Sequence, residues 1–346
     1  MTGHEIPGDV LTVADTIAEQ VLFPAAQAVD ESGTIPPGHF DLLADQGFYG
    51  LAAPEALGGL GCGFPAACAV VETLAAGCLC TTFVWLQHHG LVLQLAYGKS
   101  HRLRDEWLPQ LVSGRRRAGV ALAGTLPGPP VLVAEPAADG YVLTGNAPWV
   151  TGWGMVDVLA VAARDGDNLV WVLVDAKESD TLKIDPLRIV AVSASNTVVA
   201  EFTGHPVPAD RVISSQPYAE WARGDAGGLR MNGSLSLGLT RRCLSLLGPS
   251  PLDAEFAAAR DRLDTAEGDG LFVARAQASA LAQRAATALV AGTGSQAVLL
   301  GRDAQRLARE AMFLLVFGSR PGIKQALLPM LTGARGDSSA IPRSLT

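Results

Sequence analysis

The chain has 346 residues, too many for one ordinary domain and enough for two or three domains of roughly 100–200 residues each. Hydrophobic residues make up 49% and charged residues only 17%, below the roughly 25% of typical globular chains. Such a composition suits a membrane protein or a protein that buries much of its surface in an oligomer. A membrane-spanning helix needs about 20 nearly uninterrupted apolar residues, and runs such as DVLAVAA stop far sooner.

Several other classes of protein are disfavoured. The first residues, MTGHEIPGDVLTVAD, have neither a basic nor an apolar segment of a secretory signal, so we expect a cytoplasmic protein. With 26 Lys and Arg against 34 Asp and Glu, the net charge of -8 disfavours nucleic-acid binding. The single-residue gap between Cys78 and Cys80 does not match a zinc site, so we expect reduced, buried cysteines and no metal.

Residues 8 to about 116 are predicted to be helical. Apolar residues recur at a near-3.6 spacing between Val10 and Leu22, which indicates an amphipathic helix. After a break at SGTIPPGHF, a second helix is expected at FDLLADQGF, followed by the turn-rich loop PEALGGLGCGF. Further helices are expected at AACAVVETLAAG, FVWLQHHGLVLQLAYG and RDEWLPQLVSG, with Gly114 as a C-cap.

The pattern changes near Ala118 to short, Val-rich runs separated by Asp-Gly and Pro, which predicts antiparallel strands to about Ile213. The helical period returns after Asp225, and the tail GARGDSSAIPRSLT is expected to be flexible. The predicted fold class is therefore α+β. We predict an N-terminal helical domain (1–116), a middle β-barrel-like domain (117–222) and a C-terminal helical bundle (223–346).

Five local patterns, in this order, resemble the acyl-CoA dehydrogenase family. The first two are Gly33-Thr34-Ile35-Pro36 and then GFYGLAAPEALGGLG, which is similar to the family's G-x-x-G-x-x-x-P-E-x-x-G-G-x-G. The others are GYVLTG followed by WVT, similar to G-Y-x-L-N-G and W-I-T, then VPADRV, and finally AQRLAREAMFLLVFG. The helix–strand–helix order matches that family over most of the chain.

This resemblance implies FAD, bound between the strand domain and the C-terminal helices. Trp149 matches the aromatic residue that packs on the flavin, and Thr151 the threonine that bonds near its hydride-accepting N5. The implied cofactor-binding residues are Thr125, Trp149, Val150, Thr151 and Ser319. A large flat ring needs an apolar wall and a few polar groups, which fits these residue types. The alternative for Trp149 is a core aromatic at a strand edge.

The chain also departs from the family pattern. Where the family has T-E-P-x-A-G-S-D, this sequence has TLPGPP, which keeps Thr125 as a flavin ligand but lacks the carboxylate and the serine. The R-x-x-F-G…Q segment, which reaches the FAD of a neighbouring subunit, is replaced by GPSPLD. Phe317 occupies the position of the usual catalytic glutamate, and the second base position used by some members falls near Gly228. The expected CoA-supporting arginine maps to Leu229, with Arg230 adjacent, and no catalytic residue is assigned.

Two other groups are considered as a substitute base. His88 and His89 lie on a helix that, by the resemblance, borders the acyl cavity, and a histidine of near-neutral pKa could remove a proton. The alternative is a surface or capped histidine pair just before Gly90. Glu310 is four residues after Arg306, which favours a surface or bundle salt bridge over a catalytic role.

Three functions therefore stay open, besides a purely structural protein. The first is an FAD-dependent desaturase of an acyl-CoA or carrier-bound acyl thioester, alone or as one subunit of a mixed assembly. The second is a non-catalytic, base-less subunit of an assembly with a base-bearing paralogue. The third is a flavin enzyme of altered chemistry, such as hydroxylation. A homo- or hetero-oligomer, dimeric or tetrameric, is expected because the Ala- and Leu-rich C-terminal helices offer faces to bury.

Overall fold

The structure is a computed structural model in which residues 8–224 and 228–333 are described. It divides into two compact units, Met1–Asp225 and Ala226–Thr346. The predicted flexible tail lies, from residue 334 onward, outside the described residues. All positions discussed as candidate site residues fall within the described ranges.

The first unit begins with helices that follow the predicted order. They are α1 (Gly8–Ile17), η1 (Ala18–Leu22, a π-helix), α2 (Phe23–Ser32), α3 (Pro37–Asp45), η2 (Phe48–Gly50), η3 (Glu55–Leu57), α4 (Phe64–Gly77), α5 (Leu79–Tyr97) and α6 (His101–Val112). The single helix expected from the apolar stripe after Val10 is thus longer and contains a π-helical turn, a feature often found near functional sites. Helix α6 ends at Val112 with Ser113 as its C-cap, and the predicted cap Gly114 follows one residue later in a left-handed conformation (φ 69°).

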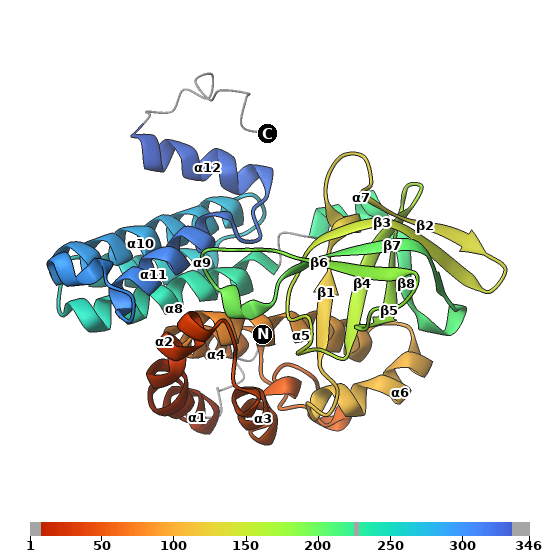
Figure 1. Cartoon of the computed structure of the whole chain (residues 1–346), viewed down its shortest axis with the longest axis horizontal. Helices are drawn as coiled ribbons and strands as arrows, with labels where there is room; N and C mark the ends of the chain where they lie inside the picture. Colours follow the sequence, from red (N-terminus) through yellow and green to blue (C-terminus); the bar gives the residue numbers. More distant parts are fainter. Residues whose placement is uncertain (1–7, 225–227, 334–346) are drawn as a thin grey trace. The chain divides into compact units, whose positions relative to one another are not determined.

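The strands of the first unit form one eight-stranded sheet with the order β6-β7-β3-β2-β4-β5-β8, and β1 pairs with β4 (Figure 1). They are β1 (Ala118–Ala121), β2 (Leu132–Ala137), β3 (Gly140–Val150), β4 (Val158–Asp165), β5 (Asn168–Asp175), β6 (Leu182–Pro186), β7 (Val198–Val207) and β8 (Val212–Pro217). Short η4 (Ala123–Thr125), η5 (Ser193–Ser195) and η6 (Ala209–Arg211) lie between them, and α7 (Tyr218–Gly224) follows.

The sheet differs from the prediction in one respect. Most of its pairs are antiparallel, but β1 and β2 pair with β4 in parallel. A parallel neighbour requires a crossover connection, and the segment from β2 to β3 separates β1 from β4 in the chain. Sequence alternation shows which residues form a strand, but it carries no information on the direction of a distant partner.

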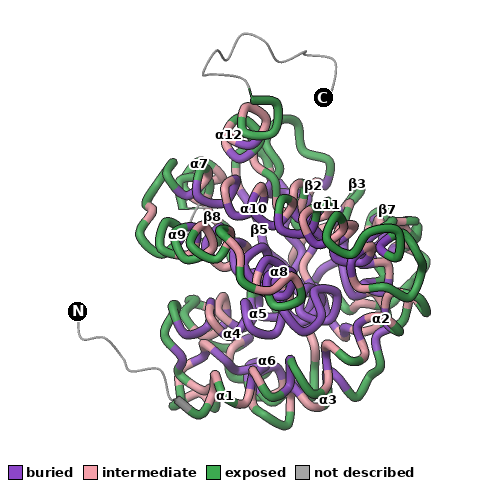
Figure 2. Tube along the Cα trace, turned by 90° about the vertical axis from the view of Figure 1, so that its left-hand side faces the viewer, coloured by how far each residue is buried: buried purple, intermediate pink, exposed green. Residues whose placement is uncertain are grey.

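Strand β4 is buried on both faces, which explains its continuous apolar sequence. Leu159, Val161 and Ala163 point into the core between strands, whereas Val158 and Ala162 pack with α5 and α6. Side chains alternate between the two faces of a strand, so each face belongs to a different core. The purple trace of α5 in Figure 2 shows the same burial along the helix that covers this sheet. Strand β4 therefore lies between two apolar cores of the first unit.

The second unit is entirely helical over its described residues. It contains α8 (Leu229–Leu247), α9 (Leu252–Thr265), α10 (Gly270–Thr293), η8 (Gly294–Val298), α11 (Asp303–Val316) and α12 (Pro321–Thr332). Two apolar clusters hold it together: Leu237, Ala259 and Leu263 with one side of α10, and Leu229, Ile323 and Leu327 with the other. The predicted fold class, helices then a sheet then helices, is confirmed.

The predicted domain boundaries stay a prediction. Position 116/117 lies between α6 and β1, whereas 222/223 falls inside α7. Among the described residues, no helix is both long and apolar enough to span a membrane. The same residues contain no cluster of three or more His, Cys, Asp or Glu side chains placed to hold a metal ion. All five cysteines are buried and free of disulfide bonds, as expected.

Candidate functional site

Trp149 stands at the end of β3 on an unusual backbone. Its φ is 61°, in the left-handed region, and the side chain is 63% exposed. The β3–β7 register shifts between Ala147 and Val150, so Trp149 lies within a bulge near the end of the strand. A left-handed conformation costs roughly 1–2 kcal/mol for a residue with a Cβ. The alternative reading of Trp149 as a core aromatic is wrong, and its indole is available to a ligand.

A second strained segment is bonded to the first. Val192 (φ 49°) and Asn196 (φ 45°) flank η5, and with Trp149 they are the non-glycine residues of positive φ in the described chain. The amide of Gly152 donates to the carbonyl of Ser195 at 2.8 Å, and that of Trp153 to the carbonyl of Asn196 at 3.2 Å. Backbone strain of this kind clusters at ligand sites, where the surrounding structure holds it in place. Segments 149–153 and 192–196 therefore define the strained corner of the sheet.

Thr151 begins a chain of buried hydroxyl groups in this corner. Its Oγ1 lies 3.2 Å from Oγ1 of Thr197, which lies 2.8 Å from Oγ of Ser195. Each hydroxyl has one donor and two acceptor positions, so the chain leaves Thr151 with capacity for one more partner. Val150, between the two predicted contact residues, points into the core and is 0% exposed, so only its backbone could touch a ligand. The sequence analysis missed Ser195 and Thr197, for which only the polar run SASNT gave a signal.

Thr125 lies near the other end of β1 from Thr151. A Cβ added to Gly119 in β1 would lie 3.3 Å from the Thr151 carbonyl oxygen, whereas Thr125 follows the strand in η4. The short strand β1 thus lies between the two segments. Thr125 is buried and its hydroxyl donates to the Leu122 carbonyl at 2.7 Å, which leaves the oxygen free to accept.

Ser319 belongs to the second unit. It is exposed in the turn after α11, and its amide donates to the carbonyl of Val316 at 3.3 Å. The preceding Gly318 has φ 58°, which ends the helix. Phe317, which the sequence resemblance assigns to the position of the usual base, stacks on Phe313 with ring centroids 5.4 Å apart. This turn contains no carboxylate.

Arg230 is held inside the helical unit. Its Nε donates to Asp264 at 2.6 Å and its Nη1 to Ser234 at 2.8 Å. The side chain is only 9% exposed, so its charge is balanced within the bundle. Arg230 and Asp264 therefore form a structural pair, and the neighbouring Gly228 position supplies no side chain to act as a base. Glu310 likewise pairs with Arg306 at 3.1 Å in the bundle, as expected.

His88 and His89 are core residues, and the expectation of a surface or capped pair is wrong. The Nδ1 of His88 accepts a hydrogen bond from the Ala118 amide at 3.0 Å, which ties α5 to the start of β1. Burial and the neighbouring His89 hold the pKa of His88 well below its usual 6.5. Burial alone lowers the pKa of His89 to about 4. Both rings are therefore neutral structural groups, which argues against a catalytic role.

The buried His89 makes stability depend on pH. Its pKa falls from 6.5 to about 4 on folding, so the unfolded chain binds the extra proton below pH 6.5. The free energy of unfolding is therefore highest above pH 6.5, where His89 is neutral in both states. It decreases as the pH falls toward 4, because only the unfolded chain takes up the proton. Between pH 7.5 and pH 5, this group alone should lower the free energy of unfolding by about 2 kcal/mol. Urea titrations at both pH values should show that loss reduced in His89→Gln and unchanged in His101→Gln, an exposed control.

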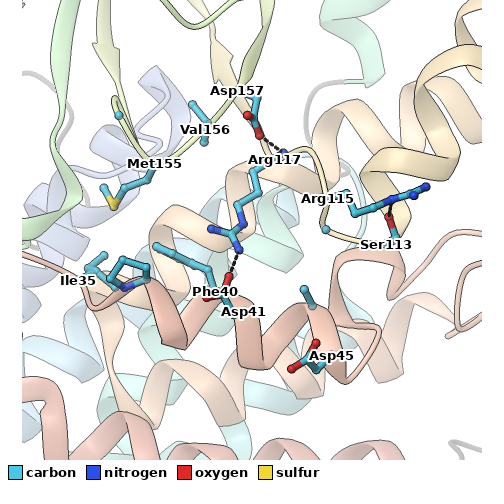
Figure 3. A pocket seen from close by; sticks show the side chains of 14 residues that line it. Ile35, Phe40, Asp41, Asp45, Ser113, Arg115, Arg117, Met155, Val156 and Asp157 are labelled. Carbon is cyan, nitrogen blue, oxygen red and sulfur yellow. Dashed lines mark hydrogen bonds and ion pairs between the residues drawn. The ribbon is translucent and has the colours of Figure 1, made fainter.

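A pocket of about 640 Å³ lies elsewhere in the first unit, between α3, the turn after α6 and residues 154–157 (Figure 3). Arg117 crosses it to pair with Asp41 at 2.5 Å, while its amide donates to Asp157 at 2.8 Å. Arg116 pairs with the same Asp157 at 3.2 Å. None of the predicted cofactor-binding residues lines this pocket, and these charges are balanced by one another.

Comparison with known proteins finds relatives of this chain by sequence and by fold. The family model for the acyl-CoA dehydrogenase N-terminal domain matches residues 9–115. The mitochondrial 2-methylacyl-CoA dehydrogenase of Solanum tuberosum is 26% identical over 215 residues, 58% of this chain and 51% of the relative. The chain thus spans about half the length of this curated relative.

Two solved structures match far more of the chain. A glutaryl-coenzyme A dehydrogenase bound to glutaryl-CoA has a TM-score of 0.82 at 19% identity and covers 97% of both chains. A glutaryl-CoA dehydrogenase of Mycobacterium smegmatis in complex with FADH2 has a TM-score of 0.81 at 16% identity and covers 96% of both. The fold is therefore that of acyl-CoA dehydrogenases.

The fold, the matching N-terminal domain and the sequence relatives agree with one another. Together they support an acyl-CoA dehydrogenase family member.

Proposed function

We propose that the chain binds FAD at the strained corner and acts on an acyl thioester as an oxidoreductase. The observation that carries this proposal is Trp149, a large aromatic residue kept exposed on a left-handed backbone. A sheet gains no core packing from such a side chain, so a ligand is the reason to retain it. Its position also matches the family's flavin-contacting aromatic residue.

The residues of this corner fit a flavin ring. Trp149 supplies an apolar face, and the hydroxyl chain that begins at Thr151 supplies a polar partner whose orientation is fixed by Thr197 and Ser195. Thr125 offers a further hydroxyl oxygen. Bound FAD would supply the acceptor for a hydride from the β-carbon of the acyl group. The protein residues would orient the ring and exclude water from one face.

A second candidate function is a base-less subunit of a mixed assembly. The observation that favours it is Phe317, whose ring stacks on Phe313 where a carboxylate would be needed. Removal of a proton next to a thioester carbonyl depends on a positioned base, a contribution of about 10²–10⁴ in rate. A partner subunit of the same family could carry that base, and a hetero-oligomer with such a paralogue would then be the active form.

Flavin content per chain tests the proposal. We expect the purified chain to hold, or to take up, close to one FAD per chain, because backbone and hydroxyl hydrogen bonds hold the corner in place. Anaerobic addition of short-chain acyl-CoA thioesters, straight and branched, should then bleach the flavin absorbance if desaturation occurs. A colourless chain that does not take up FAD contradicts the proposal and favours the base-less subunit. A yellow chain that no thioester bleaches favours altered chemistry.

A further inference from the structure

The backbone that carries Thr125 is held at three successive carbonyl oxygens. Nε of Arg164 donates to the Gly124 carbonyl at 2.6 Å, and its Nη2 donates to that of Leu126 at 3.4 Å. The Tyr218 hydroxyl donates to the intervening Thr125 carbonyl at 3.4 Å. Arg164 belongs to β4 and Tyr218 to α7, so two separate elements donate hydrogen bonds to one short segment.

The two gripping side chains also support each other. Cζ of Arg164 lies 3.2 Å from the ring centroid of Tyr218, and the arginine is only 7% exposed. Segment 124–126 is pressed against the same strand, because a Cβ on Gly124 would lie 2.7 Å from Cα of Ala163. Hydrogen bonds to its carbonyl oxygens and close packing against β4 therefore both oppose a shift of this segment.

The chemistry of Arg164 is unusual for a structural residue. A buried guanidinium loses favourable hydration unless its donors are bonded, and it is normally matched by a carboxylate. Among the described residues Arg164 has no ion pair, and carbonyl oxygens and an aromatic face balance its charge. The planar fork of an arginine can reach two carbonyls that are two residues apart, whereas a lysine ammonium is a single point.

We propose that Arg164 and Tyr218 are positioning residues for the flavin, acting through the segment that carries Thr125. The three carbonyl oxygens of residues 124–126 accept hydrogen bonds from Arg164 and Tyr218. The side chains that this region offers to a ligand are therefore the Thr125 hydroxyl and the partly exposed Leu122 and Leu126. The inference rests on the proposed function, since it assumes that this segment contacts FAD. Arg164 itself is assigned no contact with the flavin.

The test uses the full chain and two measurements. One is the dissociation constant for FAD, from a fluorescence titration. The other is hydrogen exchange of peptides covering residues 122–127 in the absence of FAD, which reports on the segment alone. The variants are Arg164→Met, Arg164→Lys and Tyr218→Leu. The matched control is Arg211→Met, because Arg211 also stacks on an aromatic ring, that of Trp107 at 4.7 Å, without touching the segment.

We expect Arg164→Met and Tyr218→Leu to weaken FAD binding about tenfold or more and to speed exchange of this segment about fivefold or more. Arg164→Lys should not restore either property, and Arg211→Met should leave both unchanged. Unchanged exchange, or FAD affinity within twofold of the wild type in Arg164→Met, overturns the inference. If the wild-type chain itself fails to bind FAD, the proposed function fails, and the role of Arg164 and Tyr218 in positioning flavin fails with it. Faster exchange in the variants would then still show that Arg164 and Tyr218 hold the segment that carries Thr125 in place.

Discussion

Replacing Trp149 by alanine or by glycine should weaken FAD binding at least tenfold, while glycine also stabilises the chain relative to alanine. The indole is 63% exposed, so its removal takes little from the core and much from the face offered to the flavin. At φ 61° alanine keeps the backbone strain that glycine releases. The free energy of unfolding should therefore be about 1 kcal/mol higher for Trp149→Gly than for Trp149→Ala.

Urea unfolding followed by circular dichroism, together with FAD titration, separates these two effects. Tyr97→Ala is the matched control, because Tyr97 is an aromatic residue of the same unit that is 69% exposed but lies at the end of α5. It should leave FAD affinity unchanged. Stoichiometric FAD in both Trp149 variants would remove this residue from the site. Equal stability of the two variants would show that the left-handed conformation carries no strain.

The order of elements was predictable because each one has a local signature. Apolar residues recur at helical spacing in α1 and α11, and Gly114 marks the end of α6. The pairing of β1 and β2 with β4 was not predictable, because strand direction depends on crossovers that leave no local pattern. The burial of both faces of β4 likewise follows from packing by α5 and α6 on one side.

The candidate site was predictable only through the family motif. Trp149 and Thr151 are marked by their neighbours in sequence, whereas their partners come from residues 192–197, some 40 positions further on. The left-handed conformation of Val192 has no signal in a single sequence, because β-branched residues rarely adopt it. Arg164 was also missed, since an arginine at the end of an apolar run is typical of a strand entering solvent. Its burial depends on Tyr218, which is contributed by a later helix.

A carboxylate at position 317 should speed the reduction of bound flavin by an acyl thioester, if the proposed function holds. If Phe317 occupies the place of the missing base, Phe317→Glu should raise the rate of flavin reduction by an acyl-CoA thioester about 10²–10⁴-fold. The turn should tolerate the change, because Arg275 donates to the Phe317 carbonyl at 3.3 Å and to the Leu314 carbonyl at 3.4 Å, independently of the side chain. Loss of the ring stacked on Phe313 should cost about 1 kcal/mol of stability.

Anaerobic stopped-flow mixing of the FAD-loaded variant with short-chain thioesters measures that rate. Phe317→Gln is the matched control, since it has nearly the same size and hydrogen-bonding capacity as glutamate but cannot take up the proton. A gain in Phe317→Glu alone would show that the missing base limits desaturation by the wild-type chain, and it predicts that a base-bearing paralogue restores turnover in a mixed assembly. Equal rates in the two variants, with FAD bound in both, would instead show that position 317 does not reach the substrate. The flavin of this chain would then serve a reaction other than α,β-desaturation.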